Sequence, residues 1–293
     1  MPSDVELKVW DLKSPPPAER VDIVVPPYMG GTDALSALGG IEVGLVQSQS
    51  IGYDGVADHL PSGLTFANAA SVHEASTAEL ALALMLAAQR QLPRFVLAQQ
   101  RGEWAPVFAD SLADRRVLLV GFGGVGKAIA TRLIPFETSF TAVARTARTE
   151  QVEGIGAVDV HGIDELPALL PDAEIVVLSL PGGEETEHLF GAEQIARMAQ
   201  EALLVNVGRG SLIDTDALVV ALGDGRIRAA LDVFEQEPIP AQHPLWSAPG
   251  LLISPHGGGA STAMNPRMAR LIRTQIERML AGEPPLNVVL PAS

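Results

Sequence analysis

Residues 117–128, VLLVGFGGVGKA, decide the fold of this chain and can be interpreted in two ways. As GxxxxGK, with Gly121, Gly126 and Lys127, the stretch is most of an ATP-binding loop. As GxGxxG, with Gly121, Gly123 and Gly126 directly after an apolar strand, it is a dinucleotide-binding turn. The ATP-binding loop needs a hydroxyl after its lysine to hold Mg²⁺, and the next residue here is alanine. The sequence therefore favours a dinucleotide.

Apolar, strand-like runs follow the glycine turn and alternate with helical segments. The runs lie at 116–120, 140–144, 175–180, 203–207, 229–233 and 251–254, and helices are expected at 126–136, 193–199 and 214–224. This alternation predicts a doubly wound parallel sheet. Shorter strand signals at 21–25, 43–46 and 64–67 predict a smaller α/β unit, and we expect long helices at 74–90, ended by Pro93, and at 266–281.

The composition is that of a folded globular protein and excludes several kinds of partner. The 293 residues are 47% apolar and 19% charged, with 20 Lys and Arg against 35 Asp and Glu. A net charge of −15 argues against nucleic-acid and membrane partners, which require basic surfaces. The absence of cysteine excludes disulfides and thiolate chemistry, and no His, Asp or Glu spacing predicts a metal site. Without a signal sequence or a long apolar run, we expect a cytoplasmic protein.

The end of the strand after the glycine turn indicates which dinucleotide is bound. An acidic residue about 20 positions on would bind the ribose 2′-hydroxyl of NAD. Here the position holds Ala144, followed by Arg145, Thr146 and Arg148. Two guanidinium groups and a hydroxyl suit a 2′-phosphate, so we expect NADP(H) to be preferred, with NAD(H) possible. A solvated basic loop is the alternative.

Three further motifs stand at the ends of later strands, where open α/β sheets bind ligands. They are NVGRG at 206–210, DVFEQEP at 232–238 and PHG at 255–257. With the glycine turn in this order, residues 52–289 resemble the D-isomer-specific 2-hydroxyacid dehydrogenases, the family of glyoxylate/hydroxypyruvate reductases and D-3-phosphoglycerate dehydrogenases. Each motif residue taken alone could be structural, but their combination is specific.

The resemblance implies roles for four of these side chains. Arg209 would hold the carboxylate and carbonyl of a 2-oxo acid, which its planar guanidinium fits in bidentate fashion. His256 would give a proton to the carbonyl oxygen, and Glu237 beside it would favour the imidazolium. Asp232 resembles a residue near the nicotinamide carboxamide. Three glycines follow His256 where the family has a bulkier residue and a serine, which predicts a more mobile loop.

The resemblance also implies the remaining binding residues. The substrate loop, whose backbone amides would bind the carboxylate, corresponds to Ser50, Ile51 and Gly52, although a plain strand-to-helix turn is an equal alternative. The cofactor-binding residues, besides those at the 2′-phosphate position, are Gly121, Gly123, Gly124, Val125, Gly126, Leu180, Pro181, Val207 and Asp232.

We therefore expect an α/β protein in which a Rossmann cofactor domain, residues 93–265, is inserted in a smaller flavodoxin-like α/β substrate domain, residues 1–92 and 266–293. Its expected activity is NAD(P)H-dependent reduction of a small 2-oxo acid, of the glyoxylate or hydroxypyruvate type, to the D-2-hydroxy acid. A short-type D-3-phosphoglycerate dehydrogenase and a non-catalytic NADP(H)-binding sensor are the alternatives. The resemblance and the long apolar helix at 74–90 also lead us to expect a homodimer formed through the cofactor domain.

Overall fold

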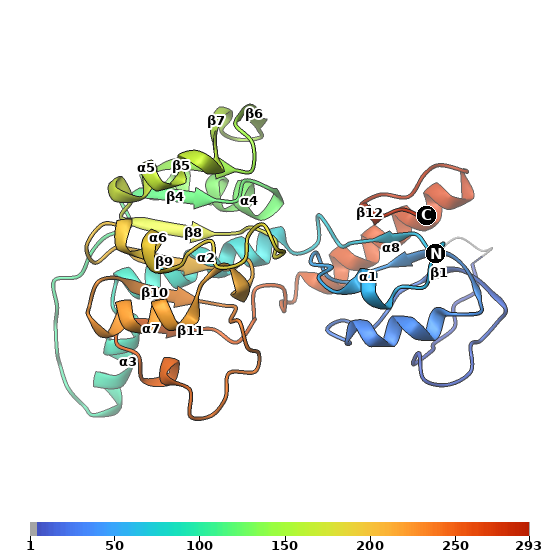
Figure 1. The fold of residues 1–293 in the computed structure, drawn as a ribbon, viewed down its shortest axis with the longest axis horizontal. Helices are drawn as coiled ribbons and strands as arrows, with labels where there is room; N and C mark the ends of the chain where they lie inside the picture. The colour runs from blue at the N-terminus through green and yellow to red at the C-terminus, as the bar shows by residue number, and fades with distance from the viewer. Residues whose placement is uncertain (1–4, 293) are drawn as a thin grey trace. The chain divides into compact units, whose positions relative to one another are not determined.

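The computed structural model describes residues 5–292, which form two compact units. The larger unit is Glu74–Ala260, and the smaller one combines the chain up to His73 with the chain from Ser261 onward (Figure 1). The expected boundaries were 92/93 and 265/266, with residues 1–4 and 293 lying outside the described part. Both observed boundaries lie earlier in the chain, and the first does so because the helix that begins at Glu74 packs against a helix and strands of the larger unit.

The larger unit is built on an eight-stranded sheet with the order β11-β10-β9-β8-β4-β5-β7-β6. All neighbouring strands are parallel except β6, which runs antiparallel to β7 at the edge. The strand order reverses between β4 and β8, so the glycine turn after β4 lies at the topological switch point, where such sheets bind ligands. The strands are β4 (Arg116–Val120), β5 (Ser139–Ala144), β6 (Arg148–Val152), β7 (Gly156–Gly162), β8 (Ile175–Leu178), β9 (Leu203–Asn206), β10 (Arg228–Leu231) and β11 (Leu251–Ile253).

Alternate residues of the central strands bury their side chains in two different cores. Val117 and Leu119 of β4 belong to a core shared with α2 and α4, whereas Leu118 and Val120 belong to a core shared with α5, α6 and α7. This confirms the expected doubly wound fold, with helices on both faces of the sheet. The helices of this unit are α2 (Glu74–Gln89), α3 (Leu92–Gln100), α4 (Gly124–Leu133), α5 (Leu166–Leu169), α6 (Ala192–Arg197) and α7 (Thr215–Gly223).

The smaller unit holds a four-stranded sheet with the order β1-β2-β3-β12, in which only β12 is antiparallel to its neighbour. Gln275 of α8 donates a hydrogen bond of 2.7 Å to Gln47 at the end of β2, joining the two ends of the chain. The elements are β1 (Arg20–Val24), β2 (Glu42–Gln47), β3 (Phe66–Ala67), β12 (Val288–Leu290), α1 (Val56–His59) and α8 (Met264–Leu280). Short 3-10 turns in the two units lie at Thr32–Leu38, Ile134–Phe136, Ile163–Glu165, Leu170–Asp172, Gly210–Leu212 and Pro244–Ser247.

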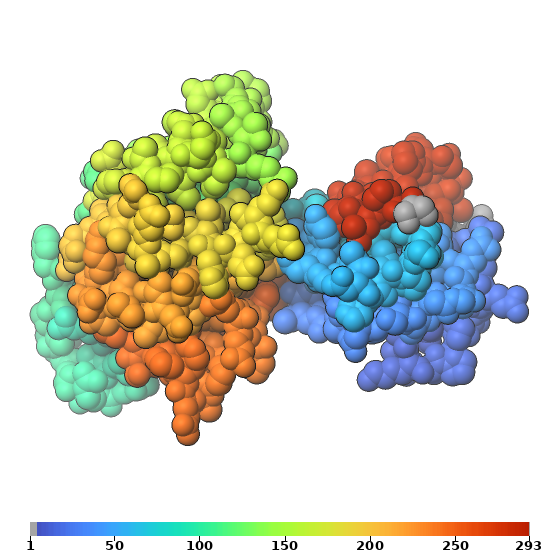
Figure 2. All heavy atoms as spheres, in the orientation of Figure 1, coloured from blue at the N-terminus to red at the C-terminus, as the bar shows by residue number. Residues whose placement is uncertain are grey.

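Two local features differ from the sequence expectations. The hairpin of β6 and β7 was not expected, and Arg148, which we expect near the 2′-phosphate, is the first residue of β6. Pro93 does not end the long helix, because the chain turns at Gln91 and Pro93 stands in the first turn of α3. Proline is tolerated there, since the first turn of a helix leaves backbone N–H groups without intrahelical partners. Both α3 and the chain after it lie at the surface of the larger unit (Figure 2).

Among residues 5–292, no helix is long and apolar enough to cross a membrane. No group of three or more acidic, histidine or cysteine side chains in the same part of the chain is placed to hold a metal ion.

Candidate active site

The turn between β4 and α4 has the backbone that a dinucleotide-binding turn requires. Gly121 has φ +106°, a conformation that residues with side chains rarely adopt. Gly126 lies so close to the strand that a Cβ there would overlap the carbonyl oxygen of Gly121. A Cβ at Gly123 would meet nothing within 4 Å, which leaves space beside the turn. The residues present therefore fit a dinucleotide whose phosphates approach the backbone of Gly123, Gly124 and Val125 at the start of α4.

The cations expected at the 2′-phosphate position lie in two different environments. Arg145 is largely exposed and forms an ion pair of 3.1 Å with Glu185. Arg148 donates hydrogen bonds to the carbonyl oxygens of Thr146 and Phe122, both at 3.3 Å, and pairs with Glu150 at 2.9 Å. Since Phe122 belongs to the glycine turn, the structure ties Arg148 to the dinucleotide-binding backbone.

Leu180, which follows β8, contacts both the glycine turn and the loop that carries Arg209. A Cβ at Gly121 would stand 2.8 Å from the Leu180 nitrogen, and one at Gly208 would stand 2.6 Å from the Leu180 oxygen. Pro181 follows directly, and Val207 is bonded through its N–H to the carbonyl of Leu178 at 3.0 Å. The predicted cofactor residues after β8 and β9 thus come together with the glycine turn at the carboxyl ends of neighbouring strands.

The loop that carries Arg209 is fixed by its own asparagine. Asn206, fully buried at the end of β9, donates to the Arg209 carbonyl at 2.7 Å and accepts from the Gly208 N–H at 3.0 Å. Gly210 packs directly on the backbone between Phe234 and Glu235, where a Cβ would overlap it. This close approach places the Arg209 loop against the DVFEQEP segment that follows β10.

Glu237 and His256 form a hydrogen-bonded pair. Oε2 of Glu237 lies 2.6 Å from Nδ1 of His256, and Oε1 of Glu237 accepts from the Phe234 N–H at 2.8 Å. The hydrogen bond with Glu237 raises the pKa of His256 against the opposing effect of burial. Burial also raises the pKa of the Glu237 carboxyl, but the bonds from His256 and Phe234 outweigh it and the net pKa is lowered. Both shifts favour the imidazolium of His256 and the carboxylate of Glu237, and in that form the Nε2 atom of His256 can donate a proton.

The loop around His256 is held by Asp232. The Asp232 side chain, 1% exposed, accepts hydrogen bonds from the Ser254 hydroxyl at 2.6 Å and from the Gly257 and Gly258 N–H groups at 2.7 and 2.8 Å. His256 has φ +53°, and its N–H donates to the Asp232 carbonyl at 2.8 Å. A Cβ at Gly258 would stand 2.9 Å from Oδ2 of Asp232, so a glycine at this position allows the close approach of the loop to the buried carboxylate.

The predicted substrate loop lies in the smaller unit, after β2. The carbonyl of Ser50 accepts from the Ala69 N–H at 2.9 Å, and that of Ile51 accepts from the Asn68 side chain at 2.8 Å. These two bonds fix the backbone just before Gly52. The role of Ser50, Ile51 and Gly52 as substrate ligands stays a prediction.

Sequence reasoning did not recognise two supports of these loops. His73 is 4% exposed, and its Nε2 lies 2.6 Å from the Gln49 carbonyl, next to the predicted substrate loop. Its ring stacks on Tyr28. Ser254 orients Asp232, and its position directly before the Pro-His pair was the only signal available in the sequence.

Comparison with known proteins agrees with this geometry. Residues 82–258 match the NAD binding domain of the D-isomer specific 2-hydroxyacid dehydrogenases. The chain is 32% identical to a glyoxylate reductase of Korarchaeum cryptofilum over 97% of its own length and 89% of the relative. It is 34% identical to a D-3-phosphoglycerate dehydrogenase of Methanocaldococcus jannaschii over 78% of its length, but the match spans only 43% of that protein.

A solved structure of a related reductase has the same fold as this chain. An NADPH-dependent glyoxylate/hydroxypyruvate reductase from Sinorhizobium meliloti, in complex with NADP and malonate, superposes with a TM-score of 0.76 at 30% identity. The superposition covers 92% of this chain and 84% of the reductase. The fold, the dinucleotide turn and the motif matches together show that this chain belongs to the D-isomer specific 2-hydroxyacid dehydrogenases, a family of NAD(P)-dependent oxidoreductases.

Proposed function

We propose that this protein reduces a small 2-oxo acid of the glyoxylate or hydroxypyruvate type to the D-2-hydroxy acid, with NADPH as the preferred reductant. The observation that carries the proposal is the 2.6 Å bond between Glu237 and His256, formed where the charge of Arg209 acts on both groups. A proton donor beside a guanidinium suits a substrate with a carbonyl next to a carboxylate.

Each of the three side chains has a separate task in this proposal. NADPH, when bound, supplies the hydride that reduces the carbonyl carbon. Arg209 binds the substrate carboxylate and orients the carbonyl, because its planar fork can donate two parallel hydrogen bonds. His256 donates the Nε2 proton to the carbonyl oxygen as negative charge develops there. Glu237 keeps His256 protonated and fixes the plane of its ring.

The preference for NADPH is supported by the end of β5. Ala144 provides no carboxylate to accept a hydrogen bond from the ribose 2′-hydroxyl of NADH. Arg145 is exposed at that strand end, and Arg148 is bonded to the glycine turn. The S. meliloti reductase, with the same fold, was solved with NADP.

An absorbance screen at the nicotinamide band tests the function. NADPH and NADH are each combined with glyoxylate, hydroxypyruvate, pyruvate, phosphohydroxypyruvate and a bulkier 2-oxo acid. We expect the highest kcat/KM with glyoxylate or hydroxypyruvate and NADPH. A preference for phosphohydroxypyruvate would indicate a phosphoglycerate dehydrogenase instead, and NADPH binding without turnover of any 2-oxo acid would indicate a sensor.

We further propose that the protein is a homodimer, and that its contact surface is α3 with the segment after it. The helix expected to form the dimer, α2, buries its apolar face inside its own unit. By contrast, Trp104 and Phe108 are 95% and 107% exposed, and Leu92, Val96 and Leu97 of α3 are also exposed. An exposed apolar patch of this kind is typical of a protein–protein contact, and a second copy of the chain is the partner we propose.

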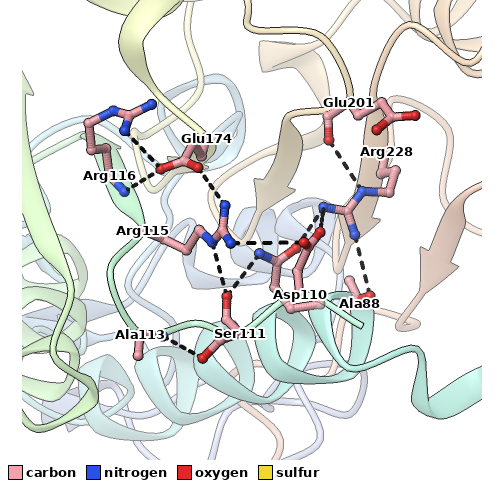
Figure 3. Close-up of polar contacts among 10 residues, drawn as sticks. Ala88, Asp110, Ser111, Ala113, Arg115, Arg116, Glu174, Glu201 and Arg228 are labelled. Atoms are coloured by element: carbon pink, nitrogen blue, oxygen red, sulfur yellow. Dashed lines mark hydrogen bonds and ion pairs between the residues drawn. The ribbon is translucent and has the colours of Figure 1, made fainter. Parts of the chain in front are cut away.

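The segment that follows α3 is held by ion pairs of Asp110, close to Phe108 (Figure 3). Asp110 lies between Arg115, at 3.9 Å, and Arg228, at 3.6 Å, and Arg115 also binds Glu174 at 2.6 Å. The anchoring orders the chain directly after the exposed aromatic residues, which lowers the entropic cost of presenting them to a partner.

Light scattering of the wild type and of the Trp104→Ser/Phe108→Ser double variant tests the dimer. The wild type should have the mass of two chains at micromolar concentration, and the variant should shift toward one. A monomeric wild type would refute this part of the proposal.

A further inference from the structure

His188 is bonded to the two loops that carry Arg209 and Glu237. Its backbone N–H donates to the carbonyl of Ser211, two residues after Arg209, at 2.8 Å. Its Nε2 lies 2.6 Å from Oε1 of Glu235, two residues before Glu237. A single residue therefore joins the loop that follows β9 to the segment that follows β10.

The backbone at His188 is held in an uncommon conformation. Its φ of +49° lies in the left-handed region, where asparagine, aspartate and histidine are the most frequent residues after glycine. Two residues later, the Phe190 N–H donates to the Leu212 carbonyl at 2.8 Å, and Phe190 pairs with Ile213 as a parallel bridge. Because such a conformation persists only where neighbouring contacts fix it, these bonds hold His188 beside Glu235.

Glu235 is bonded through both of its carboxylate oxygens. Oε1 meets His188, and Oε2 accepts from the Thr215 N–H at 2.9 Å at the start of α7. The adjacent residue, Phe234, donates through its N–H to Oε1 of Glu237 at 2.8 Å. The bonds of Glu235 therefore fix the backbone that donates a hydrogen bond to Glu237.

The charges around His188 strengthen its bond to Glu235. This hydrogen bond raises the pKa of His188 against the effect of burial, and the carboxylates of Asp214 and Glu187 act in the same direction as the bond. The shift favours a charge-assisted pair of imidazolium and carboxylate. The His188 side chain is 45% exposed and that of Glu235 is 31% exposed, so the pair changes an equilibrium by up to about fivefold.

We propose that His188 is a positioning residue for the reduction: it holds Glu235, and with it the backbone from 234 to 237, so that the Glu237 carboxylate meets Nδ1 of His256. The inference rests on the proposed function, in which His256 donates the proton. Loosening this segment weakens the bond that raises the pKa of His256, so the effect cannot exceed that of removing the Glu237 charge. Substitution of the His188 side chain leaves its N–H bond to Ser211 in place and tests the link to Glu235 alone.

Two variants of His188 separate the bond from the rest of the side chain. In His188→Asn the new side chain is too short to reach Glu235, but asparagine suits the left-handed backbone, so the variant should fold. In His188→Gln the amide nitrogen takes the place of Nε2 and can still donate to Glu235. The experiment measures the pH profile of kcat/KM for glyoxylate with NADPH saturating, and the dissociation constant of NADPH by calorimetry.

We expect His188→Asn to move the alkaline limb of the profile to lower pH, with a loss of kcat/KM there of up to about fivefold and an unchanged affinity for NADPH. His188→Gln should stay close to the wild type. Adding His188→Asn to Glu237→Gln should move the limb no further, because the bond through which His188 acts is already weakened.

The matched control is His161→Ala, which removes another histidine–glutamate pair of the larger unit. His161 lies on β7, and its Nδ1 is 2.8 Å from Oε2 of Glu165. An alkaline limb that stays in place in His188→Asn would overturn the inference, as would an equal shift in His161→Ala or a further shift in the double variant. A wild type that binds NADPH but reduces no 2-oxo acid would instead refute the proposed function, so the two failures are distinguishable.

Discussion

Replacing Glu237 by Gln tests how His256 is kept protonated. The substitution preserves the shape of the side chain and its capacity to accept a bond from the Phe234 N–H, but it removes the charge 2.6 Å from the His256 ring. A hydrogen bond to a charged group contributes about 1.5–3 kcal/mol. The His256 side chain is 40% exposed and that of Glu237 is 33% exposed, so solvent screening lowers this contribution to about 1 kcal/mol.

The sign of the pH dependence follows from the direction of the pKa shift. Bonding to Glu237 raises the pKa of His256, so reduction, which needs the imidazolium, is active below that pKa and is lost as the pH rises through it. In Glu237→Gln the pKa of His256 falls, and the alkaline limb of the pH profile moves to lower pH. About 1 kcal/mol corresponds to about a fivefold loss of kcat/KM on the alkaline side, with a much smaller loss on the acid side.

The assay is the pH profile of kcat/KM for glyoxylate reduction by the wild type and by Glu237→Gln, with NADPH saturating. An alkaline limb at the same pH in both enzymes would refute the reasoning. A uniform loss at every pH would show that Glu237 positions the ring without controlling its protonation.

Three further substitutions test other parts of the site. Arg209→Lys should raise KM for the 2-oxo acid and lower kcat, because an ammonium cannot form the bidentate pair, and equal losses on a simple aldehyde would make Arg209 structural. In Gly258→Ala the new methyl would stand 2.9 Å from Oδ2 of Asp232 and would displace the carboxylate that holds the His256 loop, so kcat for glyoxylate reduction should fall. An unchanged kcat would mean that this contact does not position His256. The wild type should prefer NADPH to NADH by about 10- to 100-fold in kcat/KM. Arg145→Ala should reduce this preference, and the further substitution Ala144→Asp should reverse it. A wild type that uses NADH equally well would contradict the assignment.

Much of the larger unit could be predicted because its signals are local. The β4 strand has the expected bounds, and the glycine turn combines a strand, three glycines and a helix within a dozen residues. The motif residues at 232–237 and at 256 also come together, because parallel strands bring their carboxyl ends to one edge of the sheet.

The features that were missed depend on contacts between distant parts of the chain. The β6 strand, RTEQV, is polar because it pairs with β7 at an exposed edge, so it lacks the apolar run that identifies a buried strand. Asp232 holds the His256 loop by accepting hydrogen bonds from the N–H groups of Gly257 and Gly258, which lie more than 20 residues further along the chain. The Glu74 side chain fills the space beside Gly124, 50 positions further along the chain, and no periodicity in the sequence relates these two residues.

The central claim is that His256 supplies the proton for reduction of a 2-oxo acid. The most direct measurement is single-turnover NADPH oxidation with glyoxylate by the wild type and by His256→Asn, accompanied by a calorimetric titration of NADPH into each. General acid catalysis typically contributes about 10²–10⁴-fold, so the variant should lose at least about a hundredfold in rate while binding NADPH with nearly unchanged affinity. A variant that oxidises NADPH at the wild-type rate would remove His256 from the reaction and contradict the account.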